Sequence, residues 1–555
     1  MGTKRTDLKK RRGIYFTPPA ISSLLVSWAV RTPGERVLEP SFGDCGFLSA
    51  LRDGFAAIGA PEPWQQIFGC DVALSAFKNS LVPLLASGAD DQHFLKADFL
   101  TLAPSNFSVS GFDVLIGNPP YVSHHNMFKI QRARASKVGY DEAFRLSGMA
   151  SLWAYFVFHS LRFLLPKGRM AWLLPGSLLN ADYSKPLLHE LARRFQRIAV
   201  VSLQERLFLG DGASETTEIL LCDGFGVEGS SAVEVVSARD LTECAELLKQ
   251  WGKTTWSPAK LNGRSVLALT SDASLSSFRR VGAAIEARRL GDLARIAIGI
   301  VTGDNRLFVV NDAIARQHHL PMCGLRPILA KASIAQGLKL LKRDFSSAQK
   351  RGSRCLLVDA RSGCEPVDRY FDAVPEHTRA ENVTFSKRID WRIPDDRQAP
   401  DAFLPYMQHN GPRLVLNNCG VNSTNTIHRV YFRPDVTTHQ AKLAAISVLS
   451  SFSQISAEIE GRSYGAGVLK HEIREANSIQ ILLPRAVSPD SINRTLAIID
   501  RLLRQGSFAG ATAAADLLLA SALPEILPCE VLESLRTLLQ LLRSRRQQVK
   551  LDNDG

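Results

Sequence analysis

Apolar residues in the first part of the chain gather into short runs and into longer stretches of helical period. The short runs, which have strand character, lie near residues 36–39, 67–71, 112–117, 169–174, 198–203 and 217–222. Between them, apolar positions recur with helical spacing over residues 18–31, 46–59, 72–87, 151–165 and 185–195. Strands that alternate with helices predict an α/β fold with a doubly wound, mostly parallel sheet.

The pattern changes near residue 226, where short strands, turns and charged helices begin to mix. From residue 486 the chain is rich in Leu, Ala and Arg and has a helical period. A chain of 555 residues exceeds one ordinary hydrophobic core. We therefore expect an α/β domain over residues 1–225, a mixed α/β domain over residues 226–485 and a helical segment over residues 486–555.

The strand of residues 112–117 leads into Asn118-Pro119-Pro120-Tyr121. Two consecutive prolines fix φ and remove two N–H donors, so the Asn118 side chain and the Pro119 carbonyl are held as acceptors beside the ring of Tyr121. Open α/β sheets bind their ligands at the carboxyl ends of their strands. The tetrapeptide is therefore suited to grip a planar group that carries an NH2. The alternative interpretation is a proline-rich turn after a strand.

Three acidic residues precede the tetrapeptide, each at or near the end of an apolar run. Glu39 ends the first strand and is followed by a turn that contains Gly43, where the backbone can approach a ligand closely. Asp71 ends the second strand, where a nucleotide-binding βαβ unit meets ribose hydroxyls. Asp98 lies beside the aromatic ring of Phe99. One such acid is often only a helix cap, but three in this order predict a cofactor site.

The order of these features resembles the catalytic domain of the gamma-class adenine-N6 DNA methyltransferases of bacterial restriction-modification systems. In that family the cofactor segment precedes the catalytic tetrapeptide, and a target-recognition domain comes last. The resemblance implies S-adenosyl-L-methionine as the cofactor and double-stranded DNA as the partner, with no metal. Within the family, the chain resembles the PstI/BsuBI-type modification enzymes.

The resemblance also implies roles for individual cofactor residues. The segment that includes Thr17 is similar to the family's first motif, which closes over the methionine part of the cofactor. By the same resemblance, Glu39 lies near the methionine amino group, Asp71 takes the ribose hydroxyls and Asp98 accepts from the adenine amine. Phe156 matches by position an aromatic residue that packs on the cofactor adenine.

The expected reaction is a direct transfer to an adenine that has left the duplex. The lone pair of adenine N6 is delocalised into the ring, so acceptors such as Asn118 Oδ1 and the Pro119 carbonyl must hold its two N–H groups. The rate then comes from positioning and fixed dipoles rather than from a strong base. Because the target atom is inaccessible inside a duplex, the base must be extruded. We expect Tyr121 and Phe208, which matches the family's stacking ring, to sandwich it.

One position departs from the family's pattern. The family usually has Gly-x-Gly after the acid-Pro pair, whereas this chain carries Cys45 at the second glycine position and Gly46 one place later. A Cβ at a turn that takes positive φ costs about 1 kcal/mol or more, so weaker cofactor binding is one consequence to test. We expect Cys45 to be a small packed residue rather than a redox group.

A basic insert over residues 122–150 interrupts the α/β alternation. Its cationic and histidine side chains are His124, His125, Lys129, Arg132, Arg134 and Lys137. Two interpretations are open at this point, namely a loop that orders on DNA and a solvated, charged helix.

The charge balance is basic, with 67 Lys and Arg against 54 Asp and Glu. The balance is 24 to 20 over residues 1–225 and 43 to 34 over residues 226–555, so the C-terminal part carries most of the excess. Such a balance favours a polyanionic partner without proving one. The nine cysteines include no Cys-x-x-Cys and no paired His spacing, which predicts a reducing cytoplasm and no zinc site. The basic N-terminus lacks an apolar h-region, so we expect neither secretion nor membrane spanning.

Four segments after residue 226 resemble, more loosely, parts of the family's recognition domain. They are residues 299–308, 325–329, 422–429 and 463–470. Their Arg and Asn side chains are candidates for reading base edges, although each is more often an ordinary loop residue. We expect residues 490–555, which end in the basic tail Arg543–Arg546, to cap the recognition domain or to bind the DNA backbone.

Other functions remain open from the sequence. The same tetrapeptide occurs in N-methyltransferases that act on RNA bases or on a protein glutamine, but the long basic C-terminal region favours DNA. A non-catalytic DNA-binding subunit is disfavoured by the intact acids and tetrapeptide. The resemblance to restriction-modification enzymes brings in a separately encoded cognate restriction endonuclease as a candidate partner.

Overall fold

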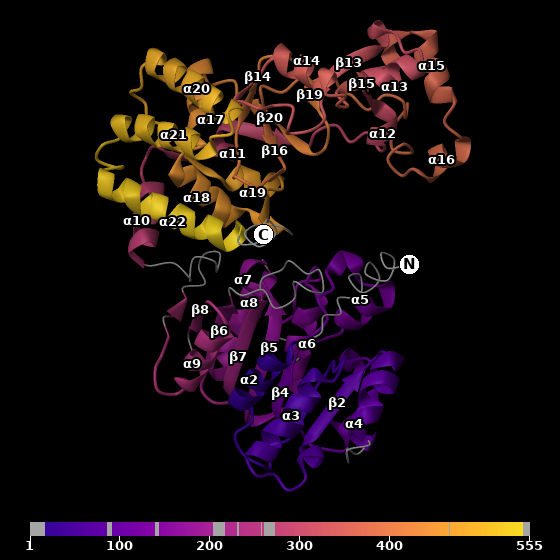
Figure 1. The fold of residues 1–555 in the computed structure, drawn as a ribbon, viewed down its shortest axis with the longest axis vertical. Helices are drawn as coiled ribbons and strands as arrows, with labels where there is room; N and C mark the ends of the chain where they lie inside the picture. Colours follow the sequence, from indigo (N-terminus) through magenta and orange to yellow (C-terminus); the bar gives the residue numbers. More distant parts are fainter. Residues whose placement is uncertain are drawn as a thin grey trace. The chain divides into compact units, whose positions relative to one another are not determined.

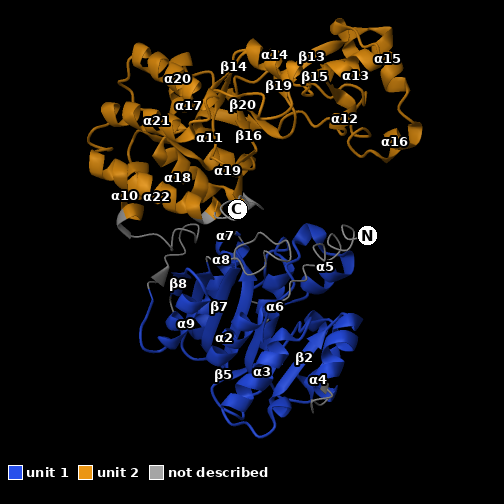
Figure 2. Ribbon diagram, in the orientation of Figure 1, with its two compact units in different colours: residues 1–269 blue, residues 270–555 orange. Residues whose placement is uncertain are grey.

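The computed structural model describes residues 17–85, 91–138, 144–181, 183–203, 217–229, 232–256, 258–259, 272–464 and 467–547. The chain divides into two compact units, residues 1–269 (unit 1) and residues 270–555 (unit 2), which Figure 2 distinguishes by colour. Within the described ranges, every helix is too short or too polar to cross a bilayer.

Among the described residues of unit 1, nine strands form one sheet in the order β3-β2-β1-β4-β5-β7-β6-β8-β9 (Figure 1). The strands are β1 Val37–Glu39, β2 Ile67–Asp71, β3 Phe94–Lys96, β4 Phe112–Gly117, β5 Leu164–Pro175, β6 Phe195–Leu203, β7 Thr217–Phe225, β8 Val233–Ala238 and β9 Pro258–Ala259. Neighbouring strands from β3 to β5 are parallel, and β7 runs antiparallel to both β5 and β6. The predicted α/β class with a mostly parallel sheet is confirmed.

Helices cover both faces of this sheet. The helical elements are α2 Pro19–Ala29, α3 Gly46–Ala57, the π-turn η2 Ala76–Leu81, α4 Val82–Leu85, α5 Lys129–Ala135, α6 Leu152–Ser160, α7 Ser177–Asn180, α8 Ser184–Arg194 and α9 Leu241–Lys249. Alternate residues of β4 enter opposite cores: Leu115 packs with α6 and α8, whereas Val114 and Ile116 pack with α2, α3 and α9. Because both faces are covered, the interior of β4 is apolar throughout rather than alternating.

The sheet of unit 1 extends past residue 225. Strand β8 pairs in parallel with β6, and β9 pairs antiparallel with β8. The last helix of the unit, α9, places Cys244 and Leu248 in the same core as α2 and α3. The described part of residues 233–259 therefore belongs by its pairing and packing to the unit 1 sheet.

Unit 2 is a mixed α/β structure, as the pattern after residue 226 predicts. In its described residues the sheets have the orders β11-β20-β16-β18-β14, β12-β15-β13-β19, β17-β22-β21 and β10-β23. Their strands are β10 Ala287–Arg289, β11 Ala294–Ala297, β12 Val309–Val310, β13 Leu325–Leu329, β14 Lys339–Leu340, β15 Leu356–Val358, β16 Ala402–Pro405, β17 Met407–Gln408, β18 Val415–Asn417, β19 Asn422–Ser423, β20 Ile427–Phe432, β21 Arg462–Tyr464, β22 Val468–Lys470 and β23 Gln480–Leu482.

The helices of unit 2 lie between and after these strands. They are α10 Asp272–Gly282, α11 Leu290–Leu293, α12 Asn305–Phe308, α13 Asp312–Gln317, α14 Lys342–Lys350, α15 Glu365–Asp372, α16 Glu376–Glu381, α17 Thr438–Ser447, α18 Ser451–Glu460, α19 Ile473–Ser478, α20 Pro489–Arg504, α21 Phe508–Ala522 and α22 Cys529–Gln547. The last three confirm the predicted helical C-terminus.

The basic tail caps unit 2 from within. The guanidinium of Arg546 lies 2.6 Å from Oε1 of Glu458, and both side chains are buried. Arg543 donates to Oε1 of Gln454 at 2.7 Å. Of the two interpretations of the C-terminal segment, the structure supports capping at Arg543 and Arg546, because both guanidinium groups donate to side chains inside unit 2.

Candidate active site at the carboxyl edge of the unit 1 sheet

The expected site lies where the strand order of the sheet reverses. The chain proceeds outward through β2 and β3 on one side of β1, and through β4 and β5 on the other side. Such a switch point leaves a crevice at the carboxyl ends of the two central strands. Glu39 ends β1 and Asn118 directly follows β4, so both residues border this crevice. A Cβ on Gly117 would make ordinary van der Waals contact with Cγ of Glu39, at 3.6 Å, so the ends of β1 and β4 are close neighbours.

The turn after β1 is held by Asp71. Its Oδ2 accepts from the backbone N–H of Gly43 at 3.0 Å, and its Oδ1 accepts from that of Ala73 at 2.7 Å. Gly43 and Cys45 both have positive φ, of 48° and 66°. The Cys45 side chain is buried, and burial raises the pKa of its thiol far above the ordinary value. Cys45 is therefore a packed residue in a left-handed conformation, as expected.

The carboxyl group of Glu39 is the most strongly perturbed acid of the crevice. Its side chain is 2% exposed, and burial together with the neighbouring Asp44 and Asp71 raises its pKa well above the ordinary value. A backbone hydrogen bond from Leu48 acts in the opposite direction. Among the described residues, Oε2 of Glu39 has no hydrogen-bond partner. A buried carboxylate oxygen requires a donor or a cation, so this position fits a positively charged group of a ligand.

Asp98, Phe99 and Phe156 lie together beyond the end of β3. Asp98 caps the short turn Phe99–Thr101, with Oδ1 accepting from the backbone N–H of Leu100 at 3.1 Å. Its Oδ2 is 2.7 Å from Nη1 of Arg134, a residue of the basic insert. The rings of Phe99 and Phe156 are 5.3 Å apart, and both are buried. The partnership with Arg134 has no local sequence signal, because the two residues are far apart in the chain.

The Asn118–Tyr121 tetrapeptide is held by three hydrogen bonds from other parts of unit 1. Nδ2 of Asn118 donates to Oγ1 of Thr17 at 3.2 Å, and the Asn118 carbonyl accepts from Oγ of Ser41 at 3.3 Å. The hydroxyl of Tyr121 donates to the carbonyl of Leu173 in β5 at 3.1 Å. Thr17 and Tyr121 were predicted as site residues, whereas the role of Ser41 was missed. Its hydroxyl follows the acid-Pro pair directly, which is the only signal in the sequence.

A backbone hydrogen bond just after Tyr121 also holds the tetrapeptide segment in place. The carbonyl of Val122 accepts from the backbone N–H of Leu152 at 2.9 Å, which ties the end of the tetrapeptide segment to the start of α6. Pro119 is buried, and Pro120 and Tyr121 are half-buried. Phe208, the other predicted partner of the target base, lies outside the described residues, as do residues 13–16 of the first motif.

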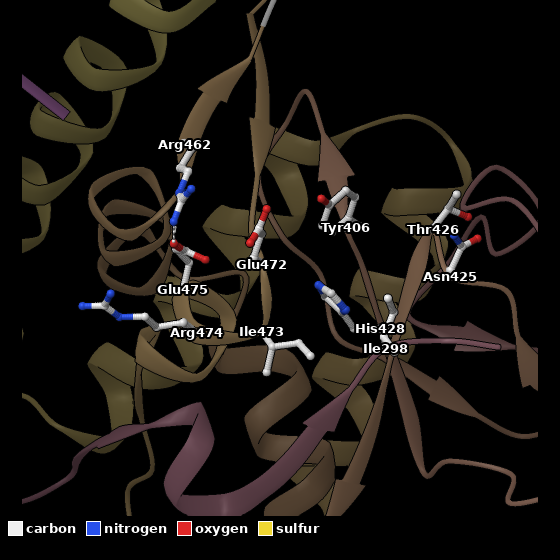
Figure 3. Close-up of a pocket in the computed structure, with 10 residues that line it drawn as sticks. All are labelled: Ile298, Tyr406, Asn425, Thr426, His428, Arg462, Glu472, Ile473, Arg474 and Glu475. Carbon is white, nitrogen blue, oxygen red and sulfur yellow. Dashed lines mark hydrogen bonds and ion pairs between the residues drawn. The ribbon is translucent and has the colours of Figure 1, made fainter. Parts of the chain in front are cut away.

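Unit 2 contains a separate cavity of about 530 Å³, shown in Figure 3. Its lining residues are Ile298, Tyr406, Asn425, Thr426, His428, Arg462, Glu472, Ile473, Arg474 and Glu475. The rings of Tyr406 and His428 meet edge to face, 5.4 Å apart, and Arg462 pairs with Glu475 at 2.7 Å. We call this space the unit 2 cavity. It brings together chain segments that are widely separated in the sequence.

One of the four segments singled out in the C-terminal part lines the unit 2 cavity, and two others begin next to lining residues. Residues 422–429 contribute Asn425, Thr426 and His428, while residues 299–308 and 463–470 begin directly after the lining residues Ile298 and Arg462. Other polar residues of these segments serve the fold instead. Arg429 pairs with Asp396 at 2.7 Å, and Asn422 donates to the same carboxylate at 3.1 Å. Across the described residues, no group of His, Cys, Asp and Glu is arranged to hold a metal ion.

Comparison with known proteins agrees with this arrangement. Residues 3–243 match the family model described as N-6 DNA Methylase, and residues 264–520 match the C-terminal domain of the Type II methyltransferase M.Eco57I. The Type II methyltransferase M.AccI of Acinetobacter calcoaceticus is 21% identical over 483 residues, which cover 85% of this chain and 86% of that protein. M.XamI of Xanthomonas campestris pv. amaranthicola is 25% identical over 495 residues and 85% of each chain.

A solved structure shares the fold over almost the whole chain. It is the Type IIL restriction-modification enzyme MmeI, solved in complex with DNA. The TM-score is 0.52 at 12% identity, and the match covers 95% of this chain and 75% of that chain. The fold of both units therefore has a precedent in one protein.

Proposed function

We propose that this chain, which is an adenine-N6 DNA methyltransferase of a restriction-modification system, holds S-adenosyl-L-methionine and a flipped adenine together at the carboxyl edge of the unit 1 sheet. The single observation that carries the proposal is the meeting of Glu39 and Asn118 at the strand-order reversal. One residue comes from the cofactor motif and the other from the catalytic tetrapeptide. In the proposed function, the reversal would bring the donor of the methyl group beside its acceptor.

The residues of the crevice fit the proposed cofactor. Glu39 and Asp71 are two acidic residues beside the Gly43 turn. The buried Oε2 of Glu39 has no hydrogen-bond donor among the described residues. An ammonium group at Glu39 would satisfy this oxygen and lower the raised pKa of Glu39. Asp71 would take the ribose hydroxyls, Asp98 the adenine amine, and Phe99 and Phe156 would line the adenine face. Thr17 would close over the methionine end.

In the reaction, the cofactor supplies an electrophilic methyl group on a sulfonium. Asn118 and the Pro119 carbonyl accept the two N–H groups of the target amine and aim its lone pair along the line of transfer. The hydrogen bond from Asn118 Nδ2 to Thr17 orients the amide so that Oδ1 is its remaining acceptor. Pro119 and Pro120 keep this acceptor pair rigid, so little reorganisation is needed at the moment of transfer.

The target base would be stacked between aromatic rings. Tyr121 is anchored at its hydroxyl by the Leu173 carbonyl, so its ring is held beside Asn118 at a fixed angle. Phe208 is proposed as the second ring on the strength of the family resemblance alone. An extruded base held in this way is exposed to the methyl donor and excluded from the duplex.

We assign target recognition to unit 2. The unit 2 cavity combines the amide of Asn425, which lies in a segment that resembles a recognition domain, with an aromatic ring and two arginines from outside those segments. Amide and guanidinium groups are the usual readers of adenine and guanine edges. The sequence predicts domains over residues 1–225, 226–485 and 486–555. Because β8 and β9 pair within the unit 1 sheet, we propose that the catalytic domain extends to residue 259.

A separately encoded cognate restriction endonuclease is proposed as the functional partner, because M.AccI and M.XamI are named as Type II methyltransferases. Assignment to the PstI/BsuBI-type subgroup stays a prediction. The match of both units to DNA methyltransferases leaves RNA bases and protein glutamine without a supporting observation.

The direct test uses purified full-length chain, unmodified duplex DNA and S-adenosyl-L-methionine with a labelled methyl group. We expect label on N6 of adenine at a limited set of sites, which sequencing of the modified DNA would map. Asn118→Ala is the matched control, because it leaves the acids of the cofactor site in place. Binding of the cofactor without any transfer would favour the alternative, a non-catalytic DNA-binding subunit.

A further inference from the structure

Helix α5 lies in the basic insert, and one side of it is packed on unit 1. Met127, Ala135 and Val138 are buried in the core that also contains α6. The two sequence interpretations of the insert were a loop that orders on DNA and a solvated helix. Residues 129–135 are a helix, and the buried residues around it show that its position is set by the core.

The start of α5 exposes two large apolar side chains, those of its N-cap residue Phe128 and of Ile130. Phe128 and Ile130 are 69% and 58% exposed, and the exposed cations Lys129 and Arg132 stand beside them. Large apolar side chains bordered by positive charge indicate a surface for a polyanion with stacking or apolar groups. Duplex DNA is the substrate of this chain, and α5 belongs to the segment that follows the catalytic tetrapeptide. DNA is therefore the occupant to which this surface is complementary.

A single ion pair joins α5 to the cofactor site. Nη1 of Arg134 lies 2.7 Å from Oδ2 of Asp98, and the side chains are 38% and 15% exposed. The other oxygen of Asp98 accepts from the backbone N–H of Leu100. A carboxylate has about four acceptor positions, so these two bonds leave room for an additional donor. Arg134 holds the carboxylate in one orientation through a short, charge-assisted bond.

We propose that Arg134 couples the cofactor site to the DNA-contacting face of α5. The proposal rests on the proposed function, in which Asp98 accepts the adenine amine of the cofactor. A ligand amine on Asp98 fixes the carboxylate, and the carboxylate fixes Arg134 and with it α5. DNA on the exposed face of α5 stabilises the same position from the other side. Each ligand then raises the affinity for the other, because both favour one arrangement of the pair.

The experiment measures this coupling without catalysis. The dissociation constant of duplex DNA that contains the mapped site is measured by fluorescence anisotropy, with and without saturating S-adenosyl-L-homocysteine. In the wild type we expect the added compound to tighten DNA binding by roughly 5-fold or more. We call the dissociation constant without the compound divided by that with the compound the coupling ratio. Arg134→Ala should bring this ratio close to one. Arg134→Lys, which keeps the charge, should retain part of the coupling.

Arg132→Ala is the matched control on the same helix. It removes an exposed cation that the proposal places on DNA, so DNA binding should weaken by the same factor with and without the compound. Hydrogen exchange gives a second measurement: S-adenosyl-L-homocysteine should slow the amides of residues 129–135 in the wild type but not in Arg134→Ala. Both readouts are independent of turnover.

The outcomes separate the coupling from the function on which it rests. A ratio in Arg134→Ala equal to that of the wild type, or a wild-type ratio of one, overturns the coupling. Asp98→Asn tests the underlying assignment by calorimetry with S-adenosyl-L-homocysteine. If Asp98→Asn binds as tightly as the wild type, the role of Asp98 in the proposed function is wrong. If Asp98→Asn loses affinity while Arg134→Ala keeps the full ratio, only the coupling fails.

Discussion

Nδ2 of Asn118 donates a hydrogen bond to Oγ1 of Thr17 across 3.2 Å, although the two residues are 101 positions apart in the chain. The contact joins the tetrapeptide to the segment that resembles the family's first motif. It gives the Asn118 amide one orientation, in which the nitrogen donates to Thr17 and the oxygen is the acceptor of the amide. In the proposed function, methyl transfer and cofactor enclosure would therefore share a hydrogen bond.

This contact predicts how variants at the two positions differ. Asn118→Ala should lower turnover by ~100-fold or more, because it removes a preorganised electrostatic group. Its affinity for S-adenosyl-L-homocysteine, measured by calorimetry, should change little. Thr17→Ala should lower turnover less, and Thr17→Ser, which keeps the hydroxyl, should remain close to the wild type. Wild-type turnover in Asn118→Ala would contradict the mechanism.

The raised pKa of Glu39 predicts a pH dependence of cofactor binding. As pH falls through this pKa, the carboxylate becomes neutral and loses its attraction for a cationic group, so cofactor affinity should fall. Calorimetry in buffers of different ionisation enthalpy should also detect proton release on binding. Glu39→Gln should bind weakly with a flatter pH profile, whereas Asp53→Asn, a change at an exposed acid, should behave as the wild type.

Glu39 should also oppose stability in the ligand-free protein. An acid whose pKa is raised on folding binds its proton more tightly in the folded state, so its stabilising contribution is present at low pH. This contribution is lost as pH rises from the unfolded pKa through the raised folded pKa. Glu39→Gln should therefore have a higher Tm than the wild type near neutral pH, with the difference shrinking in acid. An equal or lower Tm at neutral pH would show that the carboxylate is compensated.

We expect two substitutions of Cys45, to Gly and to Val, to change the free energy of unfolding by different amounts. Its φ of 66° favours glycine, but its buried side chain contributes apolar contact that glycine lacks. Because the two effects oppose each other, Cys45→Gly should change the free energy of unfolding by no more than about 1 kcal/mol. Cys45→Val adds a β-branched side chain in the same conformation and should cost about 2 kcal/mol or more. Urea unfolding of both variants provides the measurement.

Tyr121 should affect turnover on every DNA sequence alike. Tyr121→Ala removes a proposed stacking ring, so the rate should fall, with a smaller loss when the target adenine is mismatched and easier to extrude. Tyr121→Phe keeps the ring and removes only the hydrogen bond to the Leu173 carbonyl, so it should lose less. Equal losses on matched and mismatched DNA would argue against a role in holding the extruded base.

Sequence specificity should move with unit 2. A chimera that joins residues 1–269 to the recognition unit of a relative with another target should methylate the relative's sites. In the intact chain, Asn425→Ala at the unit 2 cavity should relax preference at one position by ~1–3 kcal/mol, if Asn425 reads a base edge. A variant that loses only a phosphate contact should instead lower the slope of binding against salt by roughly one unit. An active chimera with the original specificity would place recognition in unit 1.

Much of unit 1 could be predicted from the sequence because the signals are local. Short apolar runs and helical periods indicated strands and helices that the structure contains, and the two prolines after Gly117 marked the end of β4. The candidate acids also have a local signal, since each follows an apolar run. In unit 2 the same method indicated a mixed α/β class but not the strand pairing, because the strands are short and pair with distant partners.

Only the tertiary structure decided which polar residues are available to a ligand. Asn422 and Arg429 looked like candidate base readers in the sequence, yet Asp396 holds both of them. Arg134 looked like one more cation of a basic insert, and the fold places it on Asp98. These outcomes depend on charge pairing and burial between residues distant in the chain. The sequence by itself determined the strands, the turns and the chemistry of the motifs, because these depend on residues adjacent in the chain. The tertiary structure decided which distant side chains pair with the motif residues, because folding brings them together.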